Sequence, residues 1–192
     1  MGVRALTSGK RAAFLDRDGV LNRAIVRNGR PYPPATLEDL EIAPDARGAL
    51  RGLRAAGLLL VGVTNQPDVA RGTQSREVVN AINRAVRAAL SLDDLLVCFH
   101  DAKDACHCRK PRPGLLFDAA ARHGIDLASS FMIGDRWKDV AAGQSAGCAA
   151  ILIDYGYAES GPANRAADCT VRSLREAADW ILSQLGRGGD RP

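Results

Sequence analysis

Short apolar runs alternate with helix-like stretches along most of this 192-residue chain. The apolar runs have the length of buried strands and lie at 12–15, 58–63, 95–99, 131–133 and 149–153. The helix-like stretches lie at 44–56, 75–90, 113–123, 137–146 and 173–185. Because strands separated by helices pair in parallel and need cover on both faces, this order predicts an α/β fold. We expect a three-layer α/β/α, Rossmann-like domain around a central parallel sheet.

One domain accounts for the length of the chain. A hydrophobic content of 46% is enough for a sizeable core, and we predict a single domain over residues 1–185. Residues 186–192, GRGGDRP, should form a flexible tail. Segment 23–41 holds three prolines and is too long for an ordinary connection, so it should be either functional or disordered.

Charge and hydropathy restrict the partners. The net charge of +4 is mild, and no run of five like charges is present, so we expect no nucleic-acid binding. No apolar run approaches the roughly 18 residues of a membrane span, and the first residues lack the apolar core of a secretory signal. We therefore expect a cytoplasmic monomer that acts on a small anionic molecule and does not bind membranes.

Polar side chains follow four of the predicted strands. They are Asp16 and Asp18 after the first, Thr64 and Asn65 after the second, Lys110 beyond the third, and Asp135 and Asp139 after the fourth. An isolated Asp-x-Asp-Gly stretch is often only a polar turn. In open parallel sheets, however, ligands bind beyond the carboxyl ends of the strands, so this set should converge on one rim.

The chemistry of such a rim follows from its charges. Two carboxylates about 4 Å apart repel each other by roughly 4 kcal/mol at an effective dielectric constant near 20, so the site needs cations. Mg²⁺ prefers one or two carboxylates together with substrate phosphate, and Lys110 is a suitable point charge for a phosphate group. One aspartate can attack as nucleophile while its neighbour transfers protons. The set predicts phosphoryl transfer through an aspartyl-phosphate, and the lack of a Walker A motif disfavours a nucleotide as donor.

Four segments resemble the motifs of the haloacid dehalogenase-like (HAD) phosphatases. They are FLDRDGVLN, VTNQPDVARG, CRKPRPG and MIGDRWKDV, and they occur in the expected order over residues 12–155. The resemblance is closer to the capless branch that holds D-glycero-D-manno-heptose 1,7-bisphosphate phosphatases and histidinol-phosphate phosphatases. It implies that Asp16 is the nucleophile and that Asp18 is the general acid and then the base. It also implies that Thr64 and Lys110 bind phosphate, and that Asp16, Asp135 and the backbone carbonyl of Asp18 hold Mg²⁺.

The same resemblance suggests further site residues. Asp139 would support the metal site from outside, although it could equally be a solvent-exposed acid in the first turn of a helix. The predicted substrate-binding residues are Arg17, Asn65, Arg71, Arg109 and Arg136. This chain carries Pro67 and Asp68 where the commoner family sequence is TNQSGIARG, so the loop shape there is open.

Four metal-binding residue types crowd into the segment CFHDAKDACHC. Cys98, His100, Cys106 and Cys108 suit a closed tetrahedral zinc site with a structural role, while free thiols in a polar loop are the alternative. The resembling branch carries a zinc loop at this point. His107 is a rival ligand that should point away. We expect the remaining cysteines, at 148 and 169, to be small core residues.

These observations predict a Mg²⁺-dependent phosphoric monoester hydrolase acting on a sugar phosphate. Of the two substrates that the resemblance implies, arginines that outnumber acids around the rim favour D-glycero-D-manno-heptose 1,7-bisphosphate, since they can bind its second phosphate. The resemblance implies hydrolysis at the 7-phosphate. Histidinol phosphate is the alternative substrate, because its cationic amine would need carboxylates instead. From a different class, the chain could be a catalytically inactive, zinc-stabilised binding module.

Overall fold

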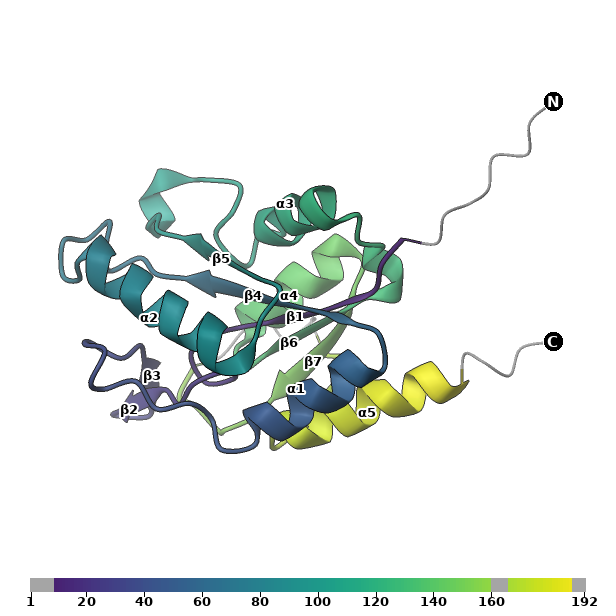
Figure 1. Ribbon diagram of the computed structural model, residues 1–192. Helices are drawn as coiled ribbons and strands as arrows, with labels where there is room; N and C mark the ends of the chain where they lie inside the picture. Colours follow the sequence, from purple (N-terminus) through teal and green to yellow (C-terminus); the bar gives the residue numbers. More distant parts are fainter. Residues whose placement is uncertain (1–8, 160–165, 188–192) are drawn as a thin grey trace, which may run out of the picture.

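A six-stranded parallel sheet forms the centre of the molecule (Figure 1). The computed structural model describes residues 9–159 and 166–187. The strands of the sheet lie in the order β5 (Asp94–Cys98), β4 (Leu59–Asn65), β1 (Ala12–Leu15), β6 (Phe131–Gly134), β7 (Ala149–Ile153) and β8 (Cys169–Val171). All five neighbouring pairs are parallel. The predicted central parallel sheet is confirmed.

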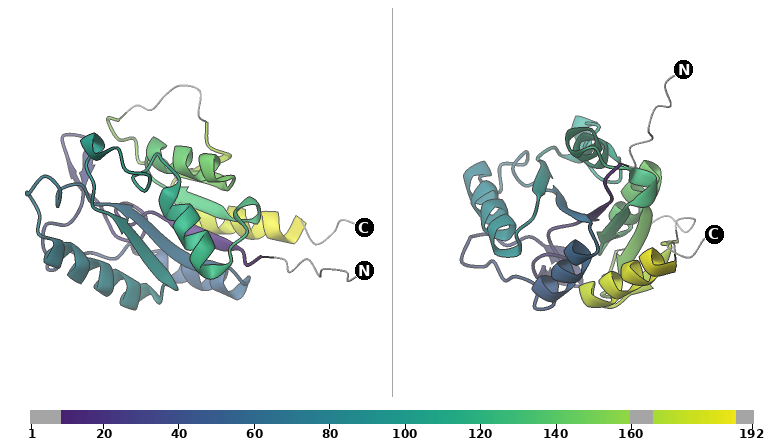
Figure 2. Two further views of the ribbon diagram at one scale, coloured as in Figure 1. Left: turned by 90° about the horizontal axis from the view of Figure 1, so that it is seen from above. Right: turned by 45° about the vertical axis from the view of Figure 1, so that its right-hand side comes forward.

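Helices cover both faces of the sheet (Figure 2). One face carries α1 (Ala46–Ala55), α2 (Arg76–Leu90) and α5 (Leu174–Arg187), and the other carries α3 (Gly114–His123) and α4 (Trp137–Ala146). Successive residues of β1 point to opposite faces. Ala13 and Leu15 enter one hydrophobic cluster, whereas Ala12 and Phe14 enter the other. The three-layer α/β/α architecture therefore has two cores, one on each side of the sheet.

Local sequence signals explain where the helices begin and end. The Ser75 hydroxyl accepts a hydrogen bond from the Val78 N–H at 3.1 Å and caps α2. Gly124 and Gly147 follow α3 and α4 in left-handed conformations, with φ of 68° and 86°. Helix α5 runs to Arg187 and so includes two residues of the predicted tail, because one glycine costs a helix only about 1 kcal/mol. The other tail residues, 188–192, lie outside the described part of the chain.

The long segment 23–41 contains a hairpin that the sequence analysis missed. Strands β2 (Ile25–Arg27) and β3 (Arg30–Tyr32) pair antiparallel through a turn at Asn28 and Gly29, which have φ of 51° and 72°. Asn-Gly is a strong signal for such a turn, but three-residue strands are too short to show periodicity. The Ala158 N–H donates to the Gly29 carbonyl at 2.8 Å and ties the hairpin to the segment after β7.

The strand order places the site. The four strands that carry the motifs are adjacent in the order β5, β4, β1 and β6, so their carboxyl ends meet at one edge. The hairpin lies at this edge, and both ends of the described chain lie at the opposite side of the molecule (Figure 1). Two short 3₁₀ turns, Ala102–Asp104 and Leu127–Ser129, complete the described elements. Among the helices of the described segments, none has both the length and the apolar composition that crossing a membrane requires.

Candidate active site

Lys110 lies at the centre of the site. Its side chain is 2 % exposed, and its ammonium nitrogen lies 2.8 Å from Asp16 Oδ1 and 2.6 Å from Asp139 Oδ1. The same nitrogen donates to the Val63 carbonyl at 2.8 Å. Burial would lower the pKa of Lys110, but the two carboxylates outweigh it and raise that pKa, so the group is a cation. Asp139 is buried, which excludes the alternative of a solvent-exposed helix acid.

Three carboxylates converge beside this lysine. One oxygen from each of Asp16, Asp135 and Asp139 lies within 4.8 Å of the other two. Both carboxylate oxygens of Asp135 are buried, and neither accepts a hydrogen bond from a described residue. Burial, and then the charges of Asp16 and Asp139, raise the pKa of Asp135 well above its usual value. A buried carboxylate without hydrogen bonds, next to two other carboxylates, is suited to binding a hard divalent cation.

The backbone is shaped closely around these acids. A Cβ on Gly19 would lie 1.8 Å from Asp135 Oδ2, and a Cβ on Gly134 would lie 2.0 Å from Asp139 Cβ. Glycine at both positions therefore lets the carboxylates approach the chain. The pKa of Asp16 is raised to about 7, chiefly by burial. The charges of Asp139 and Asp18 also raise this pKa, whereas Lys110 lowers it. Without a metal ion, the ionised forms of these buried carboxylates are therefore destabilised.

Strand β4 supplies two polar residues to the pocket. Thr64, 1 % exposed, lies at the strand end, where its hydroxyl can face a bound anion. The Asn65 side chain grips the backbone of Lys110: its amide nitrogen donates to the Lys110 carbonyl at 3.0 Å, and its oxygen accepts from the Lys110 N–H at 3.1 Å. Asn65 therefore positions Lys110, in addition to lining the pocket as predicted.

Arg17 is the one predicted substrate-binding residue that the structure places elsewhere. Its side chain is fully buried and does not line the pocket. It donates to both carboxylate oxygens of Asp18, from Nε at 3.0 Å and from Nη2 at 2.9 Å, and from Nη1 to Asn83 at 2.7 Å. The prediction of a substrate contact was wrong, because residues 16 and 18 face the pocket and the residue between them points the other way.

The other predicted arginines line the pocket, and two of them form ion pairs with acidic residues. Arg71 binds Asp101 through Nε at 3.1 Å and Nη2 at 2.7 Å, and its hydrogen bond lowers the pKa of Asp101 to about 2. Arg136 lies 2.6 Å from Glu159. Arg109 donates to the His100 carbonyl at 3.1 Å and forms no ion pair with a described acid.

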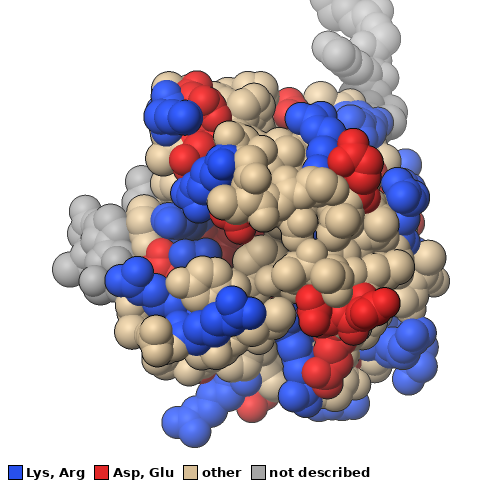
Figure 3. All heavy atoms as spheres, turned by 90° about the vertical axis from the view of Figure 1, so that its left-hand side faces the viewer, with Lys and Arg blue, Asp and Glu red and all other residues tan. Residues whose placement is uncertain are grey.

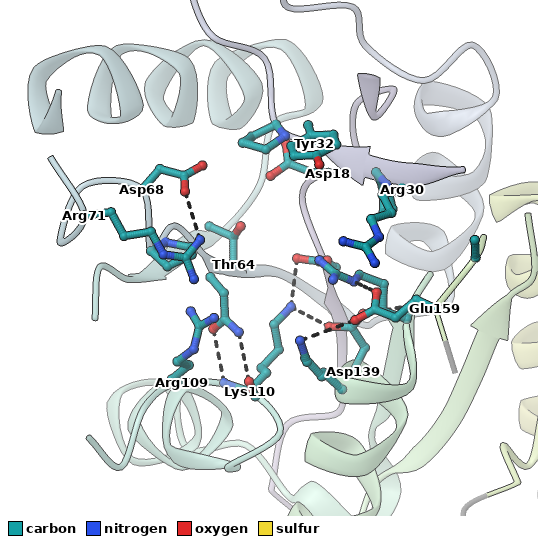
Figure 4. Close-up of a pocket in the computed structure, with 18 residues that line it drawn as sticks. Asp18, Arg30, Tyr32, Thr64, Asp68, Arg71, Arg109, Lys110, Asp139 and Glu159 are labelled. Atoms are coloured by element: carbon teal, nitrogen blue, oxygen red, sulfur yellow. Dashed lines mark hydrogen bonds and ion pairs between the residues drawn. The ribbon is translucent and has the colours of Figure 1, made fainter. Parts of the chain in front are cut away.

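The pocket is a hollow of about 570 Å³ at the carboxyl edge of the sheet. Figure 3 shows Lys and Arg side chains around this hollow, with acidic atoms at its bottom. In Figure 4, Arg30 and Tyr32 approach it from the hairpin, opposite Lys110 and Asp139. Sequence analysis gave Tyr32 no place in the site. It also missed Glu159, which binds Lys138 at 3.4 Å as well as Arg136.

The four predicted zinc ligands form a compact cluster. Cys98 Sγ lies 3.2 Å from Cys108 Sγ and 3.7 Å from Cys106 Sγ, and the His100 Nδ1 atom lies 3.4 Å from Cys108 Sγ. Tetrahedral zinc with Zn–S bonds of about 2.3 Å places its sulfurs about 3.8 Å apart, so the cluster fits this metal. The rival His107 is exposed and lies 3.5 Å from Asp118, away from the cluster.

The two remaining cysteines differ in burial. Cys148 is 5 % exposed and belongs to the core beside α3 and α4. Cys169, on the edge strand β8, is only partly buried and packs against the other core. His123 ends α3, as predicted, and its Nε2 lies 2.9 Å from Asp94 rather than near either cluster.

The parallel sheet and the aspartates with their lysine at its carboxyl edge define a HAD-like phosphatase, a phosphoric monoester hydrolase. The HAD-hydrolase-like family model matches residues 107–177, which include Lys110, Asp135 and Asp139. The crystal structure of D,D-heptose 1,7-bisphosphate phosphatase from B. bronchiseptica, complexed with magnesium and phosphate, has a TM-score of 0.76 to this chain. The two proteins are 30% identical in sequence, and the match covers 91% of this chain and 99% of the chain in that structure.

Curated relatives narrow the class further. The chain is 38% identical to the D-glycero-alpha-D-manno-heptose-1,7-bisphosphate 7-phosphatase of Mycobacterium tuberculosis H37Rv, over 92% of this chain and 94% of that protein. It is 32% identical to the corresponding D-glycero-beta-D-manno enzyme of Vibrio cholerae, over 90% and 97% of the two chains. This chain belongs to the D-glycero-D-manno-heptose-1,7-bisphosphate 7-phosphatase family.

Proposed function

We propose that this protein removes the 7-phosphate from D-glycero-D-manno-heptose 1,7-bisphosphate in a Mg²⁺-dependent reaction that passes through an aspartyl-phosphate. The observation that carries the proposal is the meeting of Asp16, Lys110 and the unsatisfied Asp135 at one edge of the sheet. The names of relatives that match most of the chain support this sugar as the substrate.

Asp16, Asp135 and the backbone carbonyl of Asp18 are the proposed ligands of Mg²⁺. The bound ion would neutralise the carboxylates and polarise a phosphoryl oxygen. The unpaired oxygens of Asp135 support this assignment, as does the magnesium in the related crystal structure. Asp139 accepts from the Arg136 N–H at 3.1 Å and holds Lys110, so we assign it to positioning the lysine.

In the first step, a carboxylate oxygen of Asp16 attacks phosphorus and forms an acyl-phosphate bond while the bond to the sugar oxygen breaks. Asp18 gives its proton to that leaving oxygen, which departs as an alcohol. Thr64 and Lys110 bind the phosphoryl oxygens. Because Lys110 is also held against Asp16, its charge remains beside the reacting oxygen as negative charge moves onto the phosphoryl group.

In the second step, a water molecule attacks the phosphorus of the aspartyl-phosphate. Asp18, ionised after the first step, takes the proton of this water, and the bond between phosphorus and Asp16 breaks. Inorganic phosphate leaves, Asp16 is regenerated as a carboxylate, and Asp18 is again protonated. Each residue thus returns to its starting state after one turnover.

The cysteine cluster is proposed to hold one structural zinc. Ordering the eleven residues from Cys98 to Cys108 costs on the order of 11–22 kcal/mol, and a structural zinc returns roughly 10–16 kcal/mol. Segment 109–110 follows directly, so the metal would fix Arg109 and Lys110 over the phosphate. The observed cluster geometry supports this role.

Free cations on the rim support a second phosphate in the substrate. Arg71 forms an ion pair with Asp101, and Arg136 forms one with Glu159. By contrast, Arg30 and Arg109 form no ion pair with a described acid, and both line the pocket. A guanidinium binds phosphate with two parallel N–H groups, so we assign the distal phosphate to Arg109, with Arg30 facing it from the hairpin.

Histidinol phosphate is the competing substrate, since Glu159 and Asp68 also line the pocket and could hold a cationic amine. Initial rates with heptose bisphosphate, heptose monophosphate and histidinol phosphate, with and without Mg²⁺, separate the candidates. We expect the bisphosphate to have the highest kcat/KM. In Arg109→Ala the preference for the bisphosphate over the monophosphate should fall about ten- to a hundredfold, because KM for the bisphosphate rises. Arg84→Ala, on the exposed face of α2, should retain this preference.

Each alternative result of this experiment has a definite meaning. Equal kcat/KM for bisphosphate and monophosphate would remove the argument for a distal phosphate. Faster turnover of histidinol phosphate would replace the proposed substrate. Failure to hydrolyse any phosphate ester in the presence of Mg²⁺ would favour a zinc-stabilised binding module.

A further inference from the structure

The Asp18 carboxylate is held by more donors than any other acid of the site. Besides the two bonds from Arg17, it accepts from Asn22 Nδ2 at 3.1 Å and from Gln66 Nε2 at 2.7 Å. Arg17 and Asn22 are fully buried behind it, and Gln66 is 2 % exposed. Of these three side chains, only that of Gln66 also bonds the side chain of a residue that lines the pocket.

That second contact is to Thr64. The same amide nitrogen of Gln66 donates to the Thr64 hydroxyl oxygen at 3.0 Å, so its two N–H groups serve Asp18 and Thr64. The orientation of the amide follows from its neighbours. Oδ2 of Asp18 already accepts from Arg17 Nη2, so this oxygen is an acceptor and faces the amide nitrogen of Gln66 rather than its oxygen. One side chain therefore joins the proposed acid–base group to a proposed phosphate-binding group.

The bond to Thr64 also fixes what its hydroxyl can do. A threonine hydroxyl carries one hydrogen and can accept as well as donate. Because its oxygen already accepts from Gln66, its hydrogen is free to turn toward an anion in the pocket that Thr64 lines. Gln66 thus sets the hydroxyl as a donor before phosphate arrives, which avoids a reorganisation during the reaction.

The position of Gln66 is fixed by the sheet. It directly follows β4, and its N–H donates to the carbonyl of Cys98, the last residue of β5, at 2.7 Å. Cys98 also belongs to the cysteine cluster. The backbone on which Gln66 is mounted is therefore tied to the segment that the proposed zinc would order.

We propose that Gln66 is a positioning residue that couples phosphate binding by Thr64 to proton transfer by Asp18. This inference rests on the roles given to these two residues in the proposed function. Gln66 does not line the pocket and acts through its hydrogen bonds to Asp18 and Thr64. Its removal should weaken two separate quantities, KM through Thr64 and the proton-dependent step through Asp18.

The leaving group gives a readout that a purely structural role would not affect. A sugar phosphate leaves as an alkoxide that needs a proton, whereas p-nitrophenolate is stable without one. Losing a hydrogen bond to a charged group costs about ten- to a hundredfold in rate. We expect Gln66→Leu to lower kcat/KM for heptose bisphosphate by this factor, and to lower kcat/KM for p-nitrophenyl phosphate at least fivefold less.

Double-mutant cycles test the coupling directly. In an Asp18→Asn background, Gln66→Leu should change kcat less than about twofold, and in a Thr64→Val background it should change KM less than about twofold. Gln144→Leu is the matched control, because that amide donates to the Ala166 carbonyl at 2.7 Å and Gln144 does not line the pocket. Gln66→Met, an unbranched replacement, serves if the leucine variant does not fold.

The outcomes separate this proposal from the proposed function. Additive cycles, or equal losses with both leaving groups, would overturn the role of Gln66 even if heptose bisphosphate is the substrate. Turnover of p-nitrophenyl phosphate without turnover of heptose bisphosphate would overturn the substrate alone, and the cycles would then use an alkyl phosphate. A crystal structure of Gln66→Leu adds a readout independent of activity: unchanged Asp18 and Thr64 side chains would contradict the proposal.

Discussion

The ammonium nitrogen of Lys110 lies 2.6 Å from Oδ1 of Asp139, and each of these two side chains is only 2 % exposed. A lysine so deeply buried depends on its acids to stay charged and in place. We expect Asp139→Asn, which keeps the side-chain shape, to lower kcat/KM by about ten- to a hundredfold. Steady-state kinetics would show this, with Asp179→Asn on the exposed face of α5 as the control. Activity within twofold of the wild type would contradict this role for Asp139.

The two aspartates of the first motif should fail in different ways. Asp16→Asn removes the attacking oxygen and a metal ligand, so we expect loss of turnover in a folded protein with no phosphorylated enzyme. Asp18→Asn keeps the nucleophile but cannot transfer protons, so Asp16 should become phosphorylated slowly and then hydrolyse poorly. Intact-protein mass spectrometry after mixing with substrate distinguishes the two. Substantial activity in Asp16→Asn would rule out the covalent route.

The metal-free site should also affect stability. The pKa of Asp16 is raised from 3.8 to about 7, mainly by burial. Between these values the unfolded chain is ionised while the folded protein keeps its proton, so stability falls as the pH rises toward 7. Asp16→Asn removes this cost. In EDTA we expect the variant to unfold at a higher temperature than the wild type at pH 8, and the gap to close near pH 4. A lower melting temperature at pH 8 would refute the argument.

One tightly bound zinc per chain is expected in protein purified without added metal. Cys106→Ser should lose most of this zinc, because serine is a poor ligand in a sulfur-rich site. Cys169→Ser, outside the cluster, should retain it. Elemental analysis of both variants provides the measurement. Unchanged zinc in Cys106→Ser, or none in the wild type, would dismiss the site.

The sequence predicted the sheet and most of the site because both depend on local patterns. Apolar runs locate the strands, and the carboxyl ends of parallel strands meet, so Asp16, Thr64, Lys110 and Asp135 could be brought together without coordinates. The hairpin at 25–32 was missed since its strands have three residues each. Its Asn28-Gly29 turn was the only available signal.

Partners far apart in the chain explain the remaining errors. Successive side chains of an extended segment point in opposite directions, which could have warned that Arg17 does not share the pocket with Asp16 and Asp18. Its actual partner Asn83 lies 66 residues away, and Gln66 lies 48 residues from Asp18. No periodicity or motif encodes such pairs, because packing of whole elements creates them.

The last prediction concerns Asp94, on the opposite edge of the sheet from the site. The carboxylate accepts from Arg122 at 2.8 Å and lies 2.9 Å from His123 Nε2. Burial would raise the pKa of Asp94, but these hydrogen bonds, with one from the Leu95 N–H, together lower it below 3.8. A lowered pKa in the folded state stabilises the protein above pH 3.8, and this contribution is lost as the pH falls through the folded value. Asp94→Asn should therefore be less stable than the wild type at pH 7, and the difference should shrink below pH 4. Denaturant unfolding across this range measures it, and a gap that stays constant with pH would show that charge at Asp94 does not contribute.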